Sequence, residues 1–317
     1  MNNRWMKLIV LGCMLAGFAH RNATAAFAPL VQVIDVKGAC TAQLADSNET
    51  KDLKGGEGLA YGTTLRTPAD GSLVLLLSAD DKITIGGDAI VVVSQDPANN
   101  TLKLIRLHRG KLDLNLKKDY EKENGLRVIT RCVAVNARLG GIYAVEATTE
   151  ADLRVVTITC ASGELDADGP DFKIPLLKDN DGITIACARD RSFIRLRCIS
   201  GKFGVQIKDS NGAERIAEMI TDSVIKILRK KSDTDGSTWI VTVLEVDPEG
   251  NVLVADTYPS TEPEGGGSGD DDGDEPIDEP GETPQGGGTF PTTTSSTTTS
   301  TTTTTVPPGD ITPVGRS

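Results

Sequence analysis

The side chains that could carry out chemistry are few, and most lie where a structural role is the simpler explanation. The sequence holds two histidines, His20 and His108. His20 falls in a segment that we expect to be removed, so a Ser-His-Asp or Cys-His arrangement would have to use His108. His108 comes directly before a Gly turn, where we expect a surface histidine. The sequence contains no phosphate-binding Gly-x-x-x-x-Gly-Lys.

Paired carboxylates could act as a general acid and base. The candidates are Asp80 with Asp81 and Asp179 with Asp181, and all four lie in turn motifs, which favours a turn role. The stretch from Asp179 to Gly182 resembles part of a calcium loop, but the rest of the EF-hand pattern is missing. We assign no catalytic, cofactor-binding or metal-binding residue.

Five cysteines remain after the leader, and at most two disulfides can form among five. Most of them lie in strand-like runs beside apolar neighbours, as small buried hydrophobic residues do. Cys187 with Cys198 is the most local candidate pair, and the connectivity stays open. There is no Cys-x-x-Cys, which argues against zinc. The five cysteines are Cys40, Cys132, Cys160, Cys187 and Cys198.

The first 25 residues have the three parts of a signal peptide: a basic start at Asn2–Lys7, an apolar run at Leu8–Ala19 and small residues at Ala23-Thr24-Ala25. Cys13 would be an early lipoprotein site, because cleavage there leaves too short an apolar run. No later apolar run reaches the length of a membrane span. We therefore expect an exported protein, periplasmic or secreted to the cell surface.

From residue 30 to 258 short apolar alternations are separated by Gly, Asp and Asn turns, as in Leu112–Leu116 and Phe203–Ile207. This pattern predicts an all-β protein. The stretch 215–229 fits either a helix or a strand. A weak repeat places a Gly and a charged residue between apolar strands at Leu107–Leu112, Cys160–Leu165 and Cys198–Phe203. It indicates either stacked equivalent turns or three ordinary Gly turns.

The acidity of the chain belongs to its last part. The net charge is −12, and residues 1–25 contribute three positive charges and no acid, so the chain without them carries −15. Residues 260–317 hold eleven acids against Arg316, which leaves about −5 for 26–259. Without a basic excess, nucleic acid is an unfavourable partner. The tail from 260 is rich in Gly, Pro, Asp and Glu, and Thr292–Thr305 is all Thr or Ser, so we expect disorder there.

Residues 31–167 resemble the FecR domain, an extracytoplasmic β-domain named after a ferric-citrate signalling regulator. The resemblance lies in the order of apolar strands, Gly turns and an Arg-Thr step. It departs from the family where Ile142 follows Gly141 in place of a Gly-Thr pair, and it weakens after residue 167. The matching segments are Val33–Gly38, Gly58–Thr67, Gly71–Leu77, Asp80–Gly86, Leu107–Leu112 and Val133–Val145.

The resemblance implies a compact, largely parallel β-solenoid or roll over 26–167, with further strands at 168–259 as an extension of the same folded unit; a β-sandwich is the alternative. It implies no catalytic residues. The anti-sigma segment and membrane helix of classical members are not found here. We expect a non-enzymatic interaction or structural module that binds an envelope protein or glycan. The alternatives are a sensor that signals through a separate membrane partner, or a polysaccharide-active enzyme.

Overall fold

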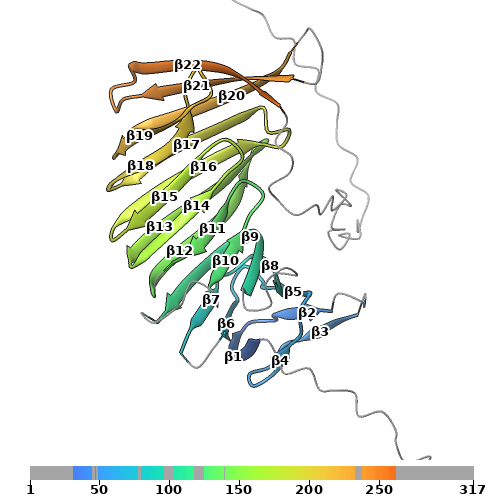
Figure 1. The fold of residues 1–317 in the computed structure, drawn as a ribbon. Helices are drawn as coiled ribbons and strands as arrows, with labels where there is room; N and C mark the ends of the chain where they lie inside the picture. Colours follow the sequence, from blue (N-terminus) through green and yellow to red (C-terminus); the bar gives the residue numbers. More distant parts are fainter. Residues whose placement is uncertain are drawn as a thin grey trace, which may run out of the picture. The chain divides into compact units, whose positions relative to one another are not determined.

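The computed structural model describes residues 31–44, 47, 49–77, 80–95, 103–117, 125–138, 140–232 and 238–261. The expected signal peptide and nearly all of the acidic, Thr-rich tail lie outside the described residues. Every regular element in the described ranges is a β-strand (Figure 1), which confirms the all-β class. Across these same ranges, no helix has the length and apolarity needed to cross a membrane.

The strands form two open ladders, sheet A and sheet B, that share β9. In sheet A the strands follow the order β4 (Gly58–Leu59), β1 (Val31–Lys37), β6 (Ser72–Leu76), β7 (Lys82–Ile85), β9 (Lys103–Leu116), β12 (Gly141–Glu150), β13 (Leu153–Ser162), β16 (Asp181–Ala188), β17 (Phe193–Ser200), β20 (Val224–Lys231), β21 (Thr238–Val246) and β22 (Val252–Thr261). In sheet B the order is β3 (Thr50–Asp52), β2 (Thr41–Gln43), β5 (Thr63–Arg66), β8 (Ile90–Gln95), β9, β10 (Leu126–Ile129), β11 (Ala134–Ala137), β14 (Glu164–Asp168), β15 (Lys173–Lys178), β18 (Lys202–Lys208) and β19 (Glu214–Ile220).

The expectation of largely parallel strands is wrong. Among the described strands the β9–β10 pair is parallel, and all other pairs are antiparallel. Most connections are short turns, and a short turn can join only antiparallel neighbours, because a parallel pair needs a crossover of a dozen residues or more. A β-solenoid is not confirmed. The two sheets instead enclose one core, as in the β-sandwich alternative.

Three glycines carry the chain from one sheet to the other, and we call Gly110, Gly163 and Gly201 the glycine corners. Gly110 divides β9 between the two sheets, Gly163 separates β13 from β14, and Gly201 separates β17 from β18. Their φ angles are +97°, +95° and +84°, in the left-handed region that glycine adopts without penalty. The weak sequence repeat therefore marks three corners, of which Gly163 and Gly201 lie on one side of the core and Gly110 lies on the other.

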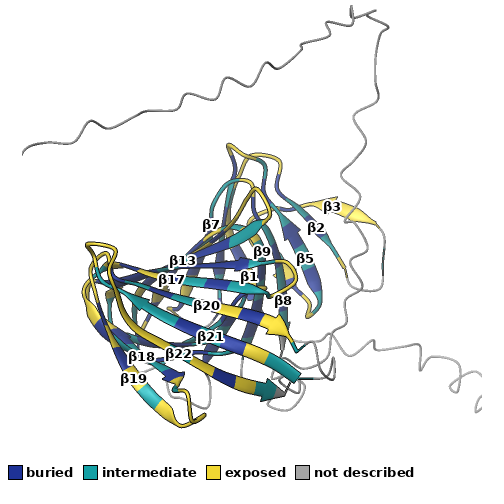
Figure 2. Ribbon diagram, turned by 90° about the horizontal axis from the view of Figure 1, so that it is seen from above, coloured by how far each residue is buried: buried dark blue, intermediate teal, exposed yellow. Residues whose placement is uncertain are grey.

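The core lies between the sheets and is one cluster that runs from Val31 to Tyr258, with no break near residue 167. Many strands contribute every second residue to it, as in β17, where Ile194, Leu196 and Cys198 are buried and Arg197 is exposed. Figure 2 shows β13, β17, β20, β21 and β22 side by side in one layer, and β18 and β19 in the other.

The stretch 215–229, open between helix and strand, forms β19 and β20 joined by a turn at Thr221–Ser223. Its apolar residues face both ways. Met219, Ile225 and Ile227 are buried, whereas Ile216 and Ile220 are exposed.

Candidate functional site

The predicted carboxylates Asp179 and Asp181 lie behind the glycine corners and hold backbone groups. Asp181 is 4% exposed and accepts hydrogen bonds from the amides of Lys178 (2.9 Å) and Lys202 (3.2 Å). The exposed Asp179 accepts one from the amide of Gly163 at 2.8 Å. Because these oxygens satisfy amides at the corners, both residues act as turn supports in the structure.

The other predicted candidates also have local structural contacts. Asp81 is buried and accepts a hydrogen bond from the Lys117 amide at 2.9 Å, and Asp80 forms an ion pair with the Lys117 side chain. His108 is half-buried in the part of β9 that belongs to sheet B. Within the described part of the chain, no group of three or more His, Cys, Asp or Glu could hold a metal ion.

Three of the five cysteines, Cys40, Cys160 and Cys198, are buried free thiols, as expected for small core residues. Burial raises the pKa of Cys160 to about 12, with nearby acids adding to the effect, and that of Cys198 to about 11. A thiol with such a pKa is almost entirely protonated at neutral pH and is a poor nucleophile.

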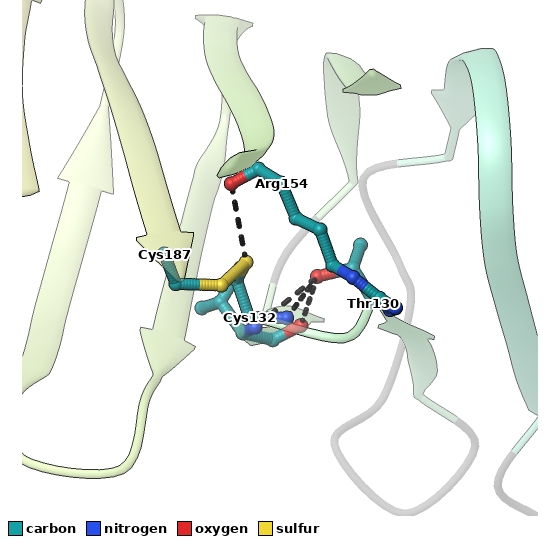
Figure 3. The surroundings of a disulfide bond; sticks show 5 residues. Thr130, Cys132, Arg154 and Cys187 are labelled. Carbon is teal, nitrogen blue, oxygen red and sulfur yellow. Dashed lines mark hydrogen bonds between the residues drawn. A yellow bond between two sulfur atoms is a disulfide. The ribbon is translucent and has the colours of Figure 1, made fainter. Parts of the chain in front are cut away.

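The remaining two cysteines form a disulfide, Cys132–Cys187, with Cα atoms 6.1 Å apart (Figure 3). Cys132 lies in the turn between β10 and β11 of sheet B, and Cys187 lies in β16 of sheet A. Thr130 shapes this turn, since its Oγ1 accepts hydrogen bonds from the amides of Cys132 (3.3 Å) and Val133 (3.1 Å). The local pair Cys187–Cys198 was wrong: in the β16–β17 register Cys187 is opposite Ile194, and Cys198 is opposite Ile183.

The disulfide lies on the side of the core away from Gly163 and Gly201, which is the side on which β9 bends at Gly110. On this side, which we call the open edge, the chain turns back within each sheet, at 151–152 and 189–192 in sheet A and at 130–133 and 169–172 in sheet B. β9 passes from sheet B to sheet A on this side at Gly110, but among the described strands from β10 onward none crosses between the sheets there. The Cys132–Cys187 bond supplies a covalent link across this edge.

A buried ion pair links the sheets at the same edge. Arg229 of β20 points into the core, and its Nε lies 3.2 Å from Oδ2 of Asp171, in the turn between β14 and β15. The two side chains are 3% and 6% exposed. The Arg229 guanidinium lies over the Trp239 ring, 5.0 Å from its centroid. Burial raises the pKa of Asp171, and the Arg229 charge partly offsets this.

Arg229 and Asp171 were not predicted from the sequence, although Arg229 leaves a signal there. Arg229 follows Ile225 and Ile227 at the same two-residue spacing, so it occupies an inward position of β20. A charged residue at an inward position requires a buried partner. Nothing in the sequence around Asp171 marks it as that partner.

The last strand of each sheet carries exposed apolar side chains. On β22 they are Val252, Leu253 and Val254, which are 58%, 66% and 36% exposed. On β19 they are Ile216 at 68% and Ile220 at 45%. The two strands are tied together beneath these side chains, since Arg215 of β19 bonds Asp256 of β22 at 2.7 Å and also pairs with Glu245 of β21. These edges are the candidate interaction site.

Comparison with known proteins identifies no family. No family profile matches the sequence, and no curated protein matches it. Two crystal structures of a proposed anti-sigma factor from Parabacteroides distasonis ATCC 8503 align with this chain at a TM-score of 0.33 and identities of 14% and 15%. The alignments cover 50% of this chain and 60% of that one. A similarity of this size carries no functional argument.

Proposed function

We propose that this chain is an exported, non-enzymatic FecR-like module of the cell envelope that binds another envelope protein by strand addition along β22. The order of the six matching segments within residues 31–167 supports the family. The Cys132–Cys187 disulfide supports export, because disulfides persist in oxidising compartments outside the cytoplasm.

The observation that carries the binding proposal is the long edge strand β22, which is paired on one side and begins with three exposed apolar residues, Val252–Val254. This strand pairs with β21 from Val252 to Thr261, and no other described strand pairs with it. Proteins protect such edges with short or charged strands. The far end of sheet B has this protection, because β3 is three exposed polar residues, Thr50 to Asp52. The main-chain groups of β22 before Pro259, flanked by the apolar side chains of Val252–Val254, suit an added strand from a partner.

The proposal is tested by crosslinking in cells that export the full-length chain, followed by affinity purification and mass spectrometry. A Leu253→Asp variant places a charge on the binding edge. Ile142→Asp is the matched control, because Ile142 is 52% exposed on β12, a strand paired on both sides. We expect one envelope protein to be recovered with the natural chain and the control, and at least about tenfold less with Leu253→Asp.

Equal recovery with both variants would exclude β22 as the binding edge. Turnover of a glycan by the purified protein would exclude the non-enzymatic role. Recovery of an integral membrane protein would favour the alternative in which this chain is a sensor that signals through a separate membrane protein.

A further inference from the structure

The outer face of the last strands of sheet A has a composition unlike the rest of the chain. The outward positions of β17, β20 and β21 are identified by their buried neighbours, such as Ile194 and Leu196 on β17 and Ile225 and Ile227 on β20. None of these outward residues is acidic, although the protein carries a net charge of −12. We call this set the basic face; it consists of Phe193, Arg195, Arg197, Val224, Lys226, Leu228, Lys230, Ile240, Thr242 and Leu244.

Two cations stand directly opposite each other at its centre. Arg195 of β17 is the register partner of Lys226 of β20. Neither side chain forms an ion pair with any described residue. Like charges at directly opposed positions of an antiparallel pair destabilise the sheet. The fold therefore keeps a local repulsion that an anion bound from outside would relieve.

The same outer surface is neutralised where it passes over earlier strands. On β9, Lys111 forms an ion pair with Asp113 at 2.9 Å, and its register partner on β12 is Glu146. The outward cations of β9 thus have acids beside them, whereas Arg195 and Lys226 on β17 and β20 have each other. Asp222, from the turn before β20, reaches the basic face and pairs with Arg197 at 2.8 Å.

Exposed apolar side chains lie between the cations. Leu228, between Lys226 and Lys230 on β20, is 40% exposed, and Ile240 beside Lys230 is 36% exposed. Figure 2 shows the three strands side by side in one layer, so these groups share one sheet surface. Basic heads on flexible apolar stems, with apolar side chains between them, match the boundary of a bilayer, where phosphates meet acyl chains. A soluble acidic polypeptide would use the cations and leave Leu228 and Ile240 in water.

We propose that the basic face lies against a membrane surface that carries anionic phospholipid headgroups. Arg195 and Lys226 contact phosphates at the centre, Lys230 contacts them at the open-edge side, and Leu228 and Ile240 enter the headgroup boundary. This binding does not depend on the FecR resemblance or on strand addition at β22, and either can fail without the other.

The test is flotation of the exported full chain with vesicles of phosphatidylglycerol and phosphatidylcholine at a ratio of about one to two, and with phosphatidylcholine alone. Each basic residue near an anionic surface strengthens binding about fivefold, so Arg195→Gln with Lys226→Gln should weaken binding to the mixed vesicles roughly thirtyfold. Lys51→Gln with Lys202→Gln is the matched control, because it removes the same charge from exposed sites on sheet B. It should bind as the natural chain does, and Leu228→Ser should weaken binding several-fold.

The proposal requires binding to the mixed vesicles that falls with added salt and is absent with phosphatidylcholine alone. It is overturned if the natural chain binds neither vesicle, or if the double variant binds as tightly as its control. Binding to poly-glutamate without binding to vesicles also overturns it, and assigns the basic face to an acidic polypeptide. Urea unfolding of each variant verifies that a loss of binding is not a loss of fold.

Discussion

Cys132 in sheet B and Cys187 in sheet A are bonded across the open edge, where no described strand from β10 onward passes between the sheets. At the opposite side the main chain itself makes the connection at Gly163 and Gly201. Asp171 and Arg229 make a second link across the open edge. From β10 onward the two sheets are thus held by the chain on one side, and by one covalent bond and one buried ion pair on the other.

Loss of the disulfide should lower stability substantially. The bond closes a loop of 55 residues, for which the chain-entropy estimate is about 4 kcal/mol. We expect the free energy of unfolding in urea to fall by roughly this amount in a Cys132→Ala, Cys187→Ala variant. A reductant should lower the midpoint of the natural chain and leave that of the variant unchanged. Equal midpoints for the oxidised natural chain and the variant would contradict this link.

Gly163 should not tolerate a side chain. A Cβ there would lie 2.4 Å from the Tyr143 hydroxyl and 2.5 Å from the carbonyl of Gly140, in addition to the strain of φ +95°. Gly212 is the control, because its φ is +78° and a Cβ would meet nothing within 4 Å. Gly212→Ala should cost about 1 kcal/mol from backbone strain alone, and Gly163→Ala at least about 3 kcal/mol. Similar losses in urea unfolding for both variants would show that the corner is loosely packed.

Local sequence pattern predicted the strands better than their arrangement. The alternation of Leu112–Leu116 and of Phe203–Ile207 places buried side chains on one face of each strand, as the structure does. The same alternation occurs in parallel and antiparallel sheets, so it could not determine strand direction. The helical spacing of Ile216 and Ile220 misleads because these residues are exposed on β19 and have no part in the core.

The disulfide pairing could not be predicted from the separation of the cysteines in the sequence. Cys187 and Cys198 are close in the chain but lie at opposite ends of the β16–β17 hairpin. Cys187 is opposite Ile194 near the turn, whereas Cys198 is opposite Ile183 at the far end. Cys132 reaches Cys187 because the sheets face each other across the core, which no local pattern encodes. Asp171 was missed for the same reason: its partner Arg229 comes from a strand of the other sheet.

Tyr143 and Tyr258 should ionise at a higher pH than an ordinary tyrosine, and their ionisation should accompany unfolding. Burial raises the pKa of Tyr143 to about 12 and that of Tyr258 to about 12, above the ordinary value of 10. Because the folded state holds these protons more tightly, their contribution to stability is complete below pH 10 and is lost as the pH rises from 10 to 12. Tyrosinate absorbance should show Tyr143 and Tyr258 ionising in this late phase. A Tyr143→Phe, Tyr258→Phe variant that kept the late phase would refute the assignment.

Breaking the Asp171–Arg229 pair from one side should cost more than removing it altogether. Each single change leaves a buried charge or polar group without its partner, so Arg229→Met or Asp171→Asn should lower the free energy of unfolding by about 3 kcal/mol or more. The double variant should recover a large part of that loss. A double-mutant cycle in urea measures the coupling, and additive losses would show that the two side chains do not interact.

The pH dependence gives an independent readout of the same pair. Burial raises the pKa of Asp171 above the unfolded value near 4, so between these two values the folded state binds more protons than the unfolded state. The stability of the natural chain should therefore fall, relative to Asp171→Asn, as the pH rises from about 4 through the raised pKa. Without the Arg229 charge, which favours the ionised carboxylate, that pKa rises further and the fall extends to higher pH in Arg229→Met. A constant difference between the natural chain and Asp171→Asn from pH 4 to neutrality would mean that Asp171 titrates normally and that its side chain is solvated.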